Sequence, residues 1–172
     1  MPYKNKDGLW IKFPADGRDT RGGEFAVPGT PERVALAHLD LVALNGSTDA
    51  PLDPGITGIP ANVVITGVDV VTTTAAAGGT SFTLGGRKFS DATDDADGFV
   101  TAAGGGLLAN LTLGSKQQFV KGTANAGAYI GTKFATAKDL SVTVTGTFTA
   151  GVVDVWIKYI VPGADATTSN FD

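Results

Sequence analysis

The chain has 172 residues, no cysteine and a formal net charge of −4. This length suits one domain, and the missing cysteines exclude disulfides, thiolate metal sites and cysteine nucleophiles. The basic residues form no patch, which argues against nucleic-acid binding. No apolar run approaches the ~18 residues of a membrane-spanning helix, and the N-terminus does not resemble a secretory signal. We therefore expect a soluble protein made in the cytoplasm, with no membrane partner.

Residues 1–33 are rich in Gly, Pro, Asp and Arg and show little hydrophobic periodicity. They nevertheless contain large apolar side chains, among them Trp10, Ile11, Phe13 and Phe25, which a purely flexible tail rarely has. We interpret the segment as an extended N-terminal arm that becomes ordered against a partner. The alternative, an irregular segment packed on its own domain, remains equally open.

Residues 34–44, VALAHLDLVAL, are dense in apolar side chains and fit either a helix or a strand. A strand would place His38 and Asp40 on one face. A hydrolytic triad needs a serine or threonine beside such a pair, and the chain has no nucleophile-elbow sequence. His38 is the only histidine, too few for a multi-histidine zinc site. We therefore expect no catalytic role for His38 and no enzymatic activity.

Residues 62–74, NVVITGVDVVTTT, follow a period of two and predict a strand that is apolar on both faces. A strand with this pattern is covered on both sides. Gly78 and Gly79 then predict a turn, with residues 80–86, TSFTLGG, as the hairpin partner.

The most chemically suggestive stretch is SDATDDADGFVTAAGGGLL, residues 90–108, in which four aspartates precede Gly98. A calcium loop of the helix–loop–helix type needs carboxylate ligands at its first and twelfth positions and a glycine at its sixth. With Gly98 at position six, Thr93 and Gly104 occupy those two positions, which excludes this motif.

The acidic stretch is better explained as the start of a helix. Residues 97–111 predict one short helix, with Asp97 as its N-cap and with glycines that break or end it. Acidic side chains also interact favourably with the positive end of a helix dipole. An irregular cation site at Asp91–Asp97 stays open as a minor alternative.

The C-terminal segment has the clearest strand pattern. In LSVTVTGTFT, residues 140–149, apolar side chains largely alternate with serine and threonine. A turn is predicted at residues 149–151, followed by a strand with Val155 on one face and Trp156 on the other. We take Trp156 as a candidate interface aromatic. Stacking on a sugar, or burial under a second sheet or the arm, are the alternatives for this side chain.

Many short strands separated by Gly/Pro turns predict an all-β fold, an antiparallel β-sandwich of jelly-roll type. We assign residues 34–162 to this sandwich, with the extended N-terminal arm at residues 1–33, one short helix, and a polar C-terminal tail at residues 163–172. No metal or cofactor is expected, since the chain has no phosphate-loop spacing and its one GxGxxA-like run follows no predicted strand.

Three stretches resemble the head decoration (cement) proteins of tailed bacteriophages. They are VVITGVDVVTTTAAAGGTSFTLGG, DADGFVTAA and LSVTVTGTFTAGVVDVWIKYIVP, which together span roughly residues 62–162. The resemblance implies a non-enzymatic virion protein that sits as a homotrimer on the outer capsid surface. There it would bridge neighbouring subunits of the major capsid protein.

This resemblance gives the arm a role, since Trp10, Ile11, Phe13 and Phe25 would anchor it to the capsid or to a neighbouring protomer. One competing hypothesis is a receptor- or carbohydrate-binding module of a phage fibre or tail tip, which would show aromatic side chains on a concave face. Another is a small hydrolase, which would gather carboxylates with perturbed pKa values around a pocket.

Overall fold

The structure, a computed structural model, describes three long ranges of the chain and three short strands ahead of them. The ranges are 32–52, 58–87 and 93–162. The short strands are β1 (Tyr3–Lys4), β2 (Trp10–Ile11) and β3 (Glu24–Ala26). Phe13 and the predicted tail at residues 163–172 lie outside the described residues.

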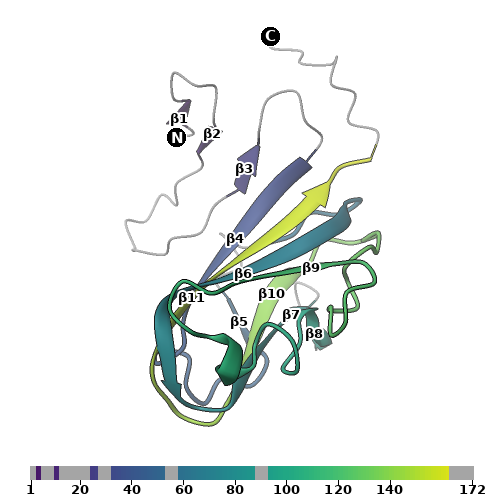
Figure 1. The fold of residues 1–172 in the computed structure, drawn as a ribbon. Coiled ribbons are helices and arrows are strands. Elements are labelled where there is room, and N and C mark those ends of the chain that lie inside the picture. The colour runs from purple at the N-terminus through teal and green to yellow at the C-terminus, as the bar shows by residue number, and fades with distance from the viewer. Residues whose placement is uncertain are drawn as a thin grey trace.

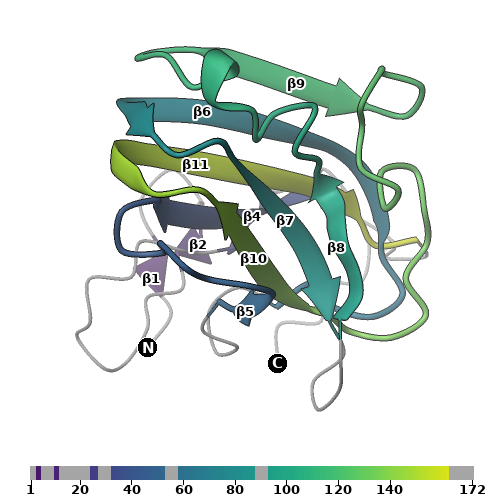
Figure 2. The same cartoon turned by 90° about the horizontal axis from the view of Figure 1, so that it is seen from below.

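Two antiparallel sheets pack face to face in the described part of the chain (Figure 1, Figure 2). The five-stranded sheet has the order β3-β4-β11-β6-β9, with β4 at Glu32–Asp40, β11 at Phe148–Ile160, β6 at Val64–Gly78 and β9 at Lys116–Val120. The four-stranded sheet has the order β5-β10-β7-β8, with β5 at Ala50–Pro51, β10 at Asp139–Thr145, β7 at Ser81–Arg87 and β8 at Thr93–Val100. A separate antiparallel pair joins β1 to β2.

The connections between strands β4 to β11 are those of a jelly roll. Every link in this series crosses from one sheet to the other, except the link from β7 to β8. Eight antiparallel strands connected in this way form two Greek keys wrapped into a double sheet. The predicted all-β sandwich of jelly-roll type is therefore confirmed, and β3 adds a fifth strand to one of its sheets.

Residues 34–44, for which helix and strand were both open, belong mainly to strand β4. Ala35, Ala37 and Leu39 are buried, and the residues between them are more exposed. This segment forms a strand because β4 pairs with β11 along its whole length, from Glu32 opposite Ile160 to Asp40 opposite Val152. Tertiary pairing thus settles a local sequence that was ambiguous by itself.

The core lies between the two sheets and is built by the inward side chains of both. Along β11 every second residue points inward, and Val153, Val155 and Ile157 are each 0% exposed. Aromatic side chains fill the space between the sheets, where the largest fully buried ones are Tyr159, Phe82, Phe99 and Phe148. Burying one such aliphatic or aromatic side chain contributes roughly 1.5–3 kcal/mol.

The turn predicted at residues 149–151 is wrong by a few positions. β10 and β11 are joined at Gly146, whose φ of 82° lies in the left-handed region that favours glycine. A Cβ at Gly146 would also lie 2.9 Å from the backbone nitrogen of Thr80. Residues 149–151 instead lie inside β11, where its pairing with β6 shifts register.

The helix predicted at residues 97–111 is also wrong in place and in length. Asp97 does not cap a helix, because it lies in β8, which pairs with β7 up to Val100. A Cβ at Gly98 would run into the ring of Tyr129, so strand packing fixes this segment. The one helix in the described ranges is a single 3-10 turn at Leu108–Asn110, and no helix there could cross a membrane.

A pair of valines in β11 tests the two-faced packing of this strand. Val155→Ala removes two methyl groups from a fully buried position and should lower the free energy of unfolding by about 1–3 kcal/mol. Val152→Ala, on the outer face of the same strand, should lower it by less than about 1 kcal/mol. Urea denaturation measures both, and equal losses would show that the assigned inward face is wrong.

Candidate functional site

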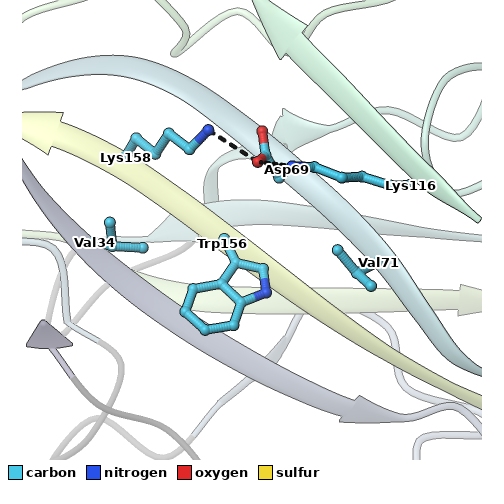
Figure 3. Close-up of a pocket in the computed structure, with 6 residues that line it drawn as sticks. All are labelled: Val34, Asp69, Val71, Lys116, Trp156 and Lys158. Atoms are coloured by element: carbon cyan, nitrogen blue, oxygen red, sulfur yellow. Dashed lines mark hydrogen bonds and ion pairs between the residues drawn. The ribbon is translucent and has the colours of Figure 1, made fainter. Parts of the chain in front are cut away.

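A shallow hollow of about 190 Å³ lies on the outer face of the five-stranded sheet. Figure 3 shows how the side chains around it come from four neighbouring strands. The lining residues are Val34 of β4, Trp156 and Lys158 of β11, Asp69 and Val71 of β6, and Lys116 of β9.

The register of the sheet brings these residues together. Trp156 lies directly opposite Asp69 in the pairing of β11 with β6. On the far side of β6, Val71 lies opposite Lys116. Because side chains alternate along β11, burial of Val155 in the core turns Trp156 toward the outer face.

Asp69 is the electrostatic centre of the hollow and is only 5% exposed. Its Oδ2 accepts from Lys158 Nζ at 2.8 Å and is 3.2 Å from Lys116 Nζ. Its Oδ1 is buried and finds no hydrogen-bond partner among the described residues. One carboxylate held between two ammonium groups leaves the hollow with one net positive charge.

Trp156 gives the hollow an apolar side. In Figure 3 its indole ring lies between Val34 and Val71, while the two lysines approach Asp69 from opposite directions. An amphipathic ring beside fixed charges is the type of anchor found at interface hot spots. What these residues supply is contact area and charge, which suits binding of a partner more than bond-breaking chemistry.

His38 of β4 also lies on the outer face of the five-stranded sheet, but its side chain does not pair with Asp40. Its Nδ1 is 2.6 Å from Asp154 Oδ1, across the β4–β11 pairing. Asp40 instead accepts hydrogen bonds from the backbone N–H groups of Val42 and Ala43, at 3.0 and 3.2 Å, and so stabilises the turn that follows β4. His38 and Asp154 therefore form a cross-strand pair on the sheet surface.

The residues predicted for the arm are placed only in part. Trp10 and Ile11 form β2, where they lie opposite Lys4 and Tyr3. Phe25 belongs to β3 and lies opposite Val34 at the edge of the five-stranded sheet, as the neighbouring positions of β3 and β4 in Figure 1 show. Their role as anchors stays a prediction, as does the interface role of Trp156.

The acidic stretch is a strand whose aspartates have different surroundings. Asp94 forms an ion pair with Lys138, and the backbone N–H of Asp97 donates to Asp95 Oδ1 at 3.2 Å. A hydrogen bond between the side chains of Asp97 and Asp95, followed by burial, raises the pKa of the Asp97 carboxyl. Asp91 lies outside the described ranges, within which no group of three or more acidic or histidine side chains could hold a metal ion.

The cluster of Asp69 with Lys116 and Lys158 could not be predicted from local sequence patterns. The one local signal is a lone carboxylate inside an otherwise uncharged strand. Its ion-pair partner Lys158 is 89 residues away, so alternation along one strand could not reveal the contact. The partner of Asp94 was missed for the same reason, since Lys138 is 44 residues away.

A second buried carboxylate lies on the outer side of the four-stranded sheet. Asp139 is 4% exposed, and its Oδ1 has no hydrogen-bond partner among the described residues. Burial raises the pKa of the Asp139 carboxyl, and the Arg87 guanidinium, on the residue opposite in β7, offsets part of that increase. The folded state therefore holds the Asp139 proton more tightly than the unfolded state does.

No protein-family model and no curated protein sequence matches the chain. The solved structures that are similar to this chain include two from phage capsids. The cyanophage Pam1 capsid asymmetric unit contains a chain with 16% identity and a TM-score of 0.45, and the match covers 80% of this chain and 92% of that one. The capsid of Ralstonia phage GP4 gives 12% identity and a TM-score of 0.44, covering 78% and 88%. Likeness at this level assigns no function to the chain.

Replacing Asp69 tests the electrostatic account of the hollow. Asp69→Asn should destabilise the protein by about 1–3 kcal/mol, because two lysines then share a site without their buried counter-charge. Lys116→Met is the matched control, since its side chain is 61% exposed and its loss should cost less than about 1 kcal/mol. Thermal unfolding measures the stability of both variants. An Asp69→Asn protein as stable as the Lys116→Met control would show that Asp69 does not hold the two lysines in place.

Asp139 predicts a pH dependence with a definite sign. Because the pKa of Asp139 is raised in the folded state, ionisation of this carboxyl costs more in the folded than in the unfolded protein. Its contribution to stability is therefore lost as pH rises above the ordinary aspartate pKa of about 4. Asp139→Asn, which cannot ionise, should therefore melt at a higher temperature than the parent protein at pH 7. The difference should shrink toward pH 4, and a difference that is constant with pH would contradict the assignment.

Proposed function

We propose that this chain is a non-enzymatic structural protein of a phage virion, a capsid decoration or cement protein. In this role it binds the outer surface of the shell and bridges neighbouring subunits of the major capsid protein. The sequence resemblance over roughly residues 62–162 suggested this function, and the geometry of the outer face supports it.

The observation that carries the proposal is the continuity between the arm and the hollow. β3, the last strand of the arm, pairs with the edge of β4, where Phe25 lies opposite Val34. Val34 in turn lines the hollow beside Trp156. The N-terminal segment therefore meets the domain next to the hollow, as expected for an arm and a face that bind one partner together.

The physics of a shell suits a small binding domain of this kind. A closed lattice offers many copies of one site, so modest contacts repeated over the particle add up to firm attachment. A homotrimer would engage three sites at once through symmetry-related surfaces. The net positive charge of the Asp69 cluster would help to orient the protein on an acidic patch of the partner.

A second candidate function is a receptor- or carbohydrate-binding module of a phage fibre or tail tip. The observation that favours it is Trp156 in a hollow beside charged groups, since sugar-binding sites also combine an aromatic face with polar side chains. Binding of the isolated protein to a glycan, and not to capsid shells, would support this candidate instead.

Arm deletion and loss of the tryptophan test the proposal by co-sedimentation with purified, undecorated shells. Removal of residues 1–30 should abolish binding because the arm contributes ordered contact area. Trp156→Ala should weaken binding roughly tenfold or more. Thr83→Ala, on the four-stranded sheet, serves as the control and should bind like the parent protein.

The core residues that the structure describes all lie after residue 32. The truncated protein should therefore keep its fold, as circular dichroism can check. A folded truncated protein that still decorates shells would show that the arm is not the anchor. A parent protein that fails to bind shells at all would overturn the proposed function.

A further inference from the structure

Lys138 is a buried lysine at the end of the sandwich, just before β10. Its backbone N–H donates to the carbonyl oxygen of Ile59 at 2.9 Å, and its carbonyl oxygen accepts from the N–H of Ile59 at 2.7 Å. Its side chain is 9% exposed, and Nζ contacts Oδ2 of Asp94 on β8. A primary amine and a carboxyl group from two separate elements are thus held against each other.

Aromatic rings form much of the surroundings of this pair. Lys138 Nζ lies 5.4 Å from the ring centroids of both Tyr129 and Phe134. These two rings pack edge to face at 4.9 Å, and Phe99 packs on Tyr129 at 5.1 Å. The rings keep water from one side of the amine and hold its position, which makes the local dielectric low.

Gly86 makes the space in which the lysine lies. A Cβ at this position would lie 3.1 Å from Lys138 Cδ and 3.0 Å from the Tyr129 ring. Either contact is tight enough that a larger residue would push the two side chains away. The absence of a side chain in β7 therefore keeps the lysine stem and the ring in place.

Tyr129, whose ring centroid lies 5.4 Å from Lys138 Nζ, also carries a hydroxyl. Its Oη is buried and has no hydrogen-bond partner among the described residues. Burial, and then the charges of Asp94 and Asp95, raise the pKa of the Tyr129 phenol. The hydroxyl therefore keeps its proton at neutral pH and can donate a hydrogen bond to an oxygen that gains negative charge.

We propose that Lys138 and Asp94 form an intramolecular amide bond, a covalent cross-link between β8 and the start of β10. This inference stands on the geometry of the sandwich end and does not rest on the proposed function.

The chemistry is a condensation that needs no oxidant, metal or cofactor. One proton passes from the Lys138 ammonium to the Asp94 carboxylate, and the neutral Nζ attacks Cγ. A second proton passes from nitrogen to the departing oxygen, and the C–O bond breaks. An ammonium and a carboxylate thereby become one amide and one water molecule, while Tyr129 stabilises the oxygen of the intermediate.

Two physical effects favour the amide over the ion pair. Fixed elements hold the reacting atoms together, which replaces an encounter in solution with a high effective concentration. The amide is neutral, so its formation removes two charges that are expensive to keep beside aromatic rings. The Asp94 side chain is 35% exposed, which leaves a path to solvent for the water that is released.

The bond would act as a staple in a chain that has no cysteine. It would close a loop of 44 residues, and closing a loop of that size restricts the unfolded chain as a disulfide does. It would also tie down β8, which is one of the two edge strands of the four-stranded sheet.

Intact-mass spectrometry of the purified, denatured full chain tests the proposal. The mass should be about 18 Da below the value calculated from the sequence, which corresponds to the loss of one water. Lys138→Met and Asp94→Ala should each restore the mass calculated for the variant. In a peptide map, trypsin should no longer cleave after Lys138, and the peptide that contains Asp94 should be joined to the one that contains Lys138.

The controls separate this bond from other losses of water. Lys158→Met, which removes one of the two lysines paired with Asp69 and leaves Lys138 and Asp94 untouched, should keep the mass deficit. Asp97–Gly98 can lose water by forming a cyclic imide, but that deficit would persist in Lys138→Met and disappear with hydroxylamine. If Lys138→Met does not fold, Lys138→Arg keeps the positive charge and still cannot form the amide.

A folded parent protein with its full calculated mass would overturn the proposal and leave Lys138 and Asp94 as an ion pair only. A deficit that remains in the Lys138 variants would overturn it as well.

Discussion

The pairing of β11 with a strand on each side is the constraint on which the rest of the structure depends. Nine residues of β11 pair in unbroken register with β4, and the opposite edge pairs with β6. This register turns Val155 into the core and Trp156 outward over Asp69. A shift by one residue would exchange the two faces. It would bury Lys158 in the core and break up the charged cluster, so the hollow on the outer face follows directly from the packing of the core.

Ion pairs between side chains reinforce this arrangement at two separate places in the sandwich. Asp69 joins β6 to β11 and β9 through two lysines on the outer face. Lys138 joins the start of β10 to Asp94 of β8 at one end of the molecule. Burying such groups is costly unless they are paired, so each pair penalises any packing that separates its members. In a chain without cysteine, these contacts take the place of disulfides in holding strand to strand.

Local patterns predict the strands but not what the strands bring together. Alternation along the last strand was enough to put Trp156 on the outer face. The turn was misplaced because residues 149–151 and Gly146 both satisfy turn chemistry, and only pairing with the neighbouring sheet decides between them. The predicted helix at 97–111 failed because Gly98 is needed for contact with a ring from another segment. Asp69 stands out in the sequence as the only charged residue of its strand, but its ion pairs are made with lysines far along the chain.

The central claim is that many copies of this protein coat a capsid, and counting copies tests it most directly. Quantitative mass spectrometry of purified virions would give the ratio of this chain to the major capsid protein. A decoration protein bound to a symmetric shell predicts on the order of hundreds of copies per particle, in a fixed ratio to the shell subunits. A count of a few copies per particle, as for a fibre or a tail tip, would contradict the account.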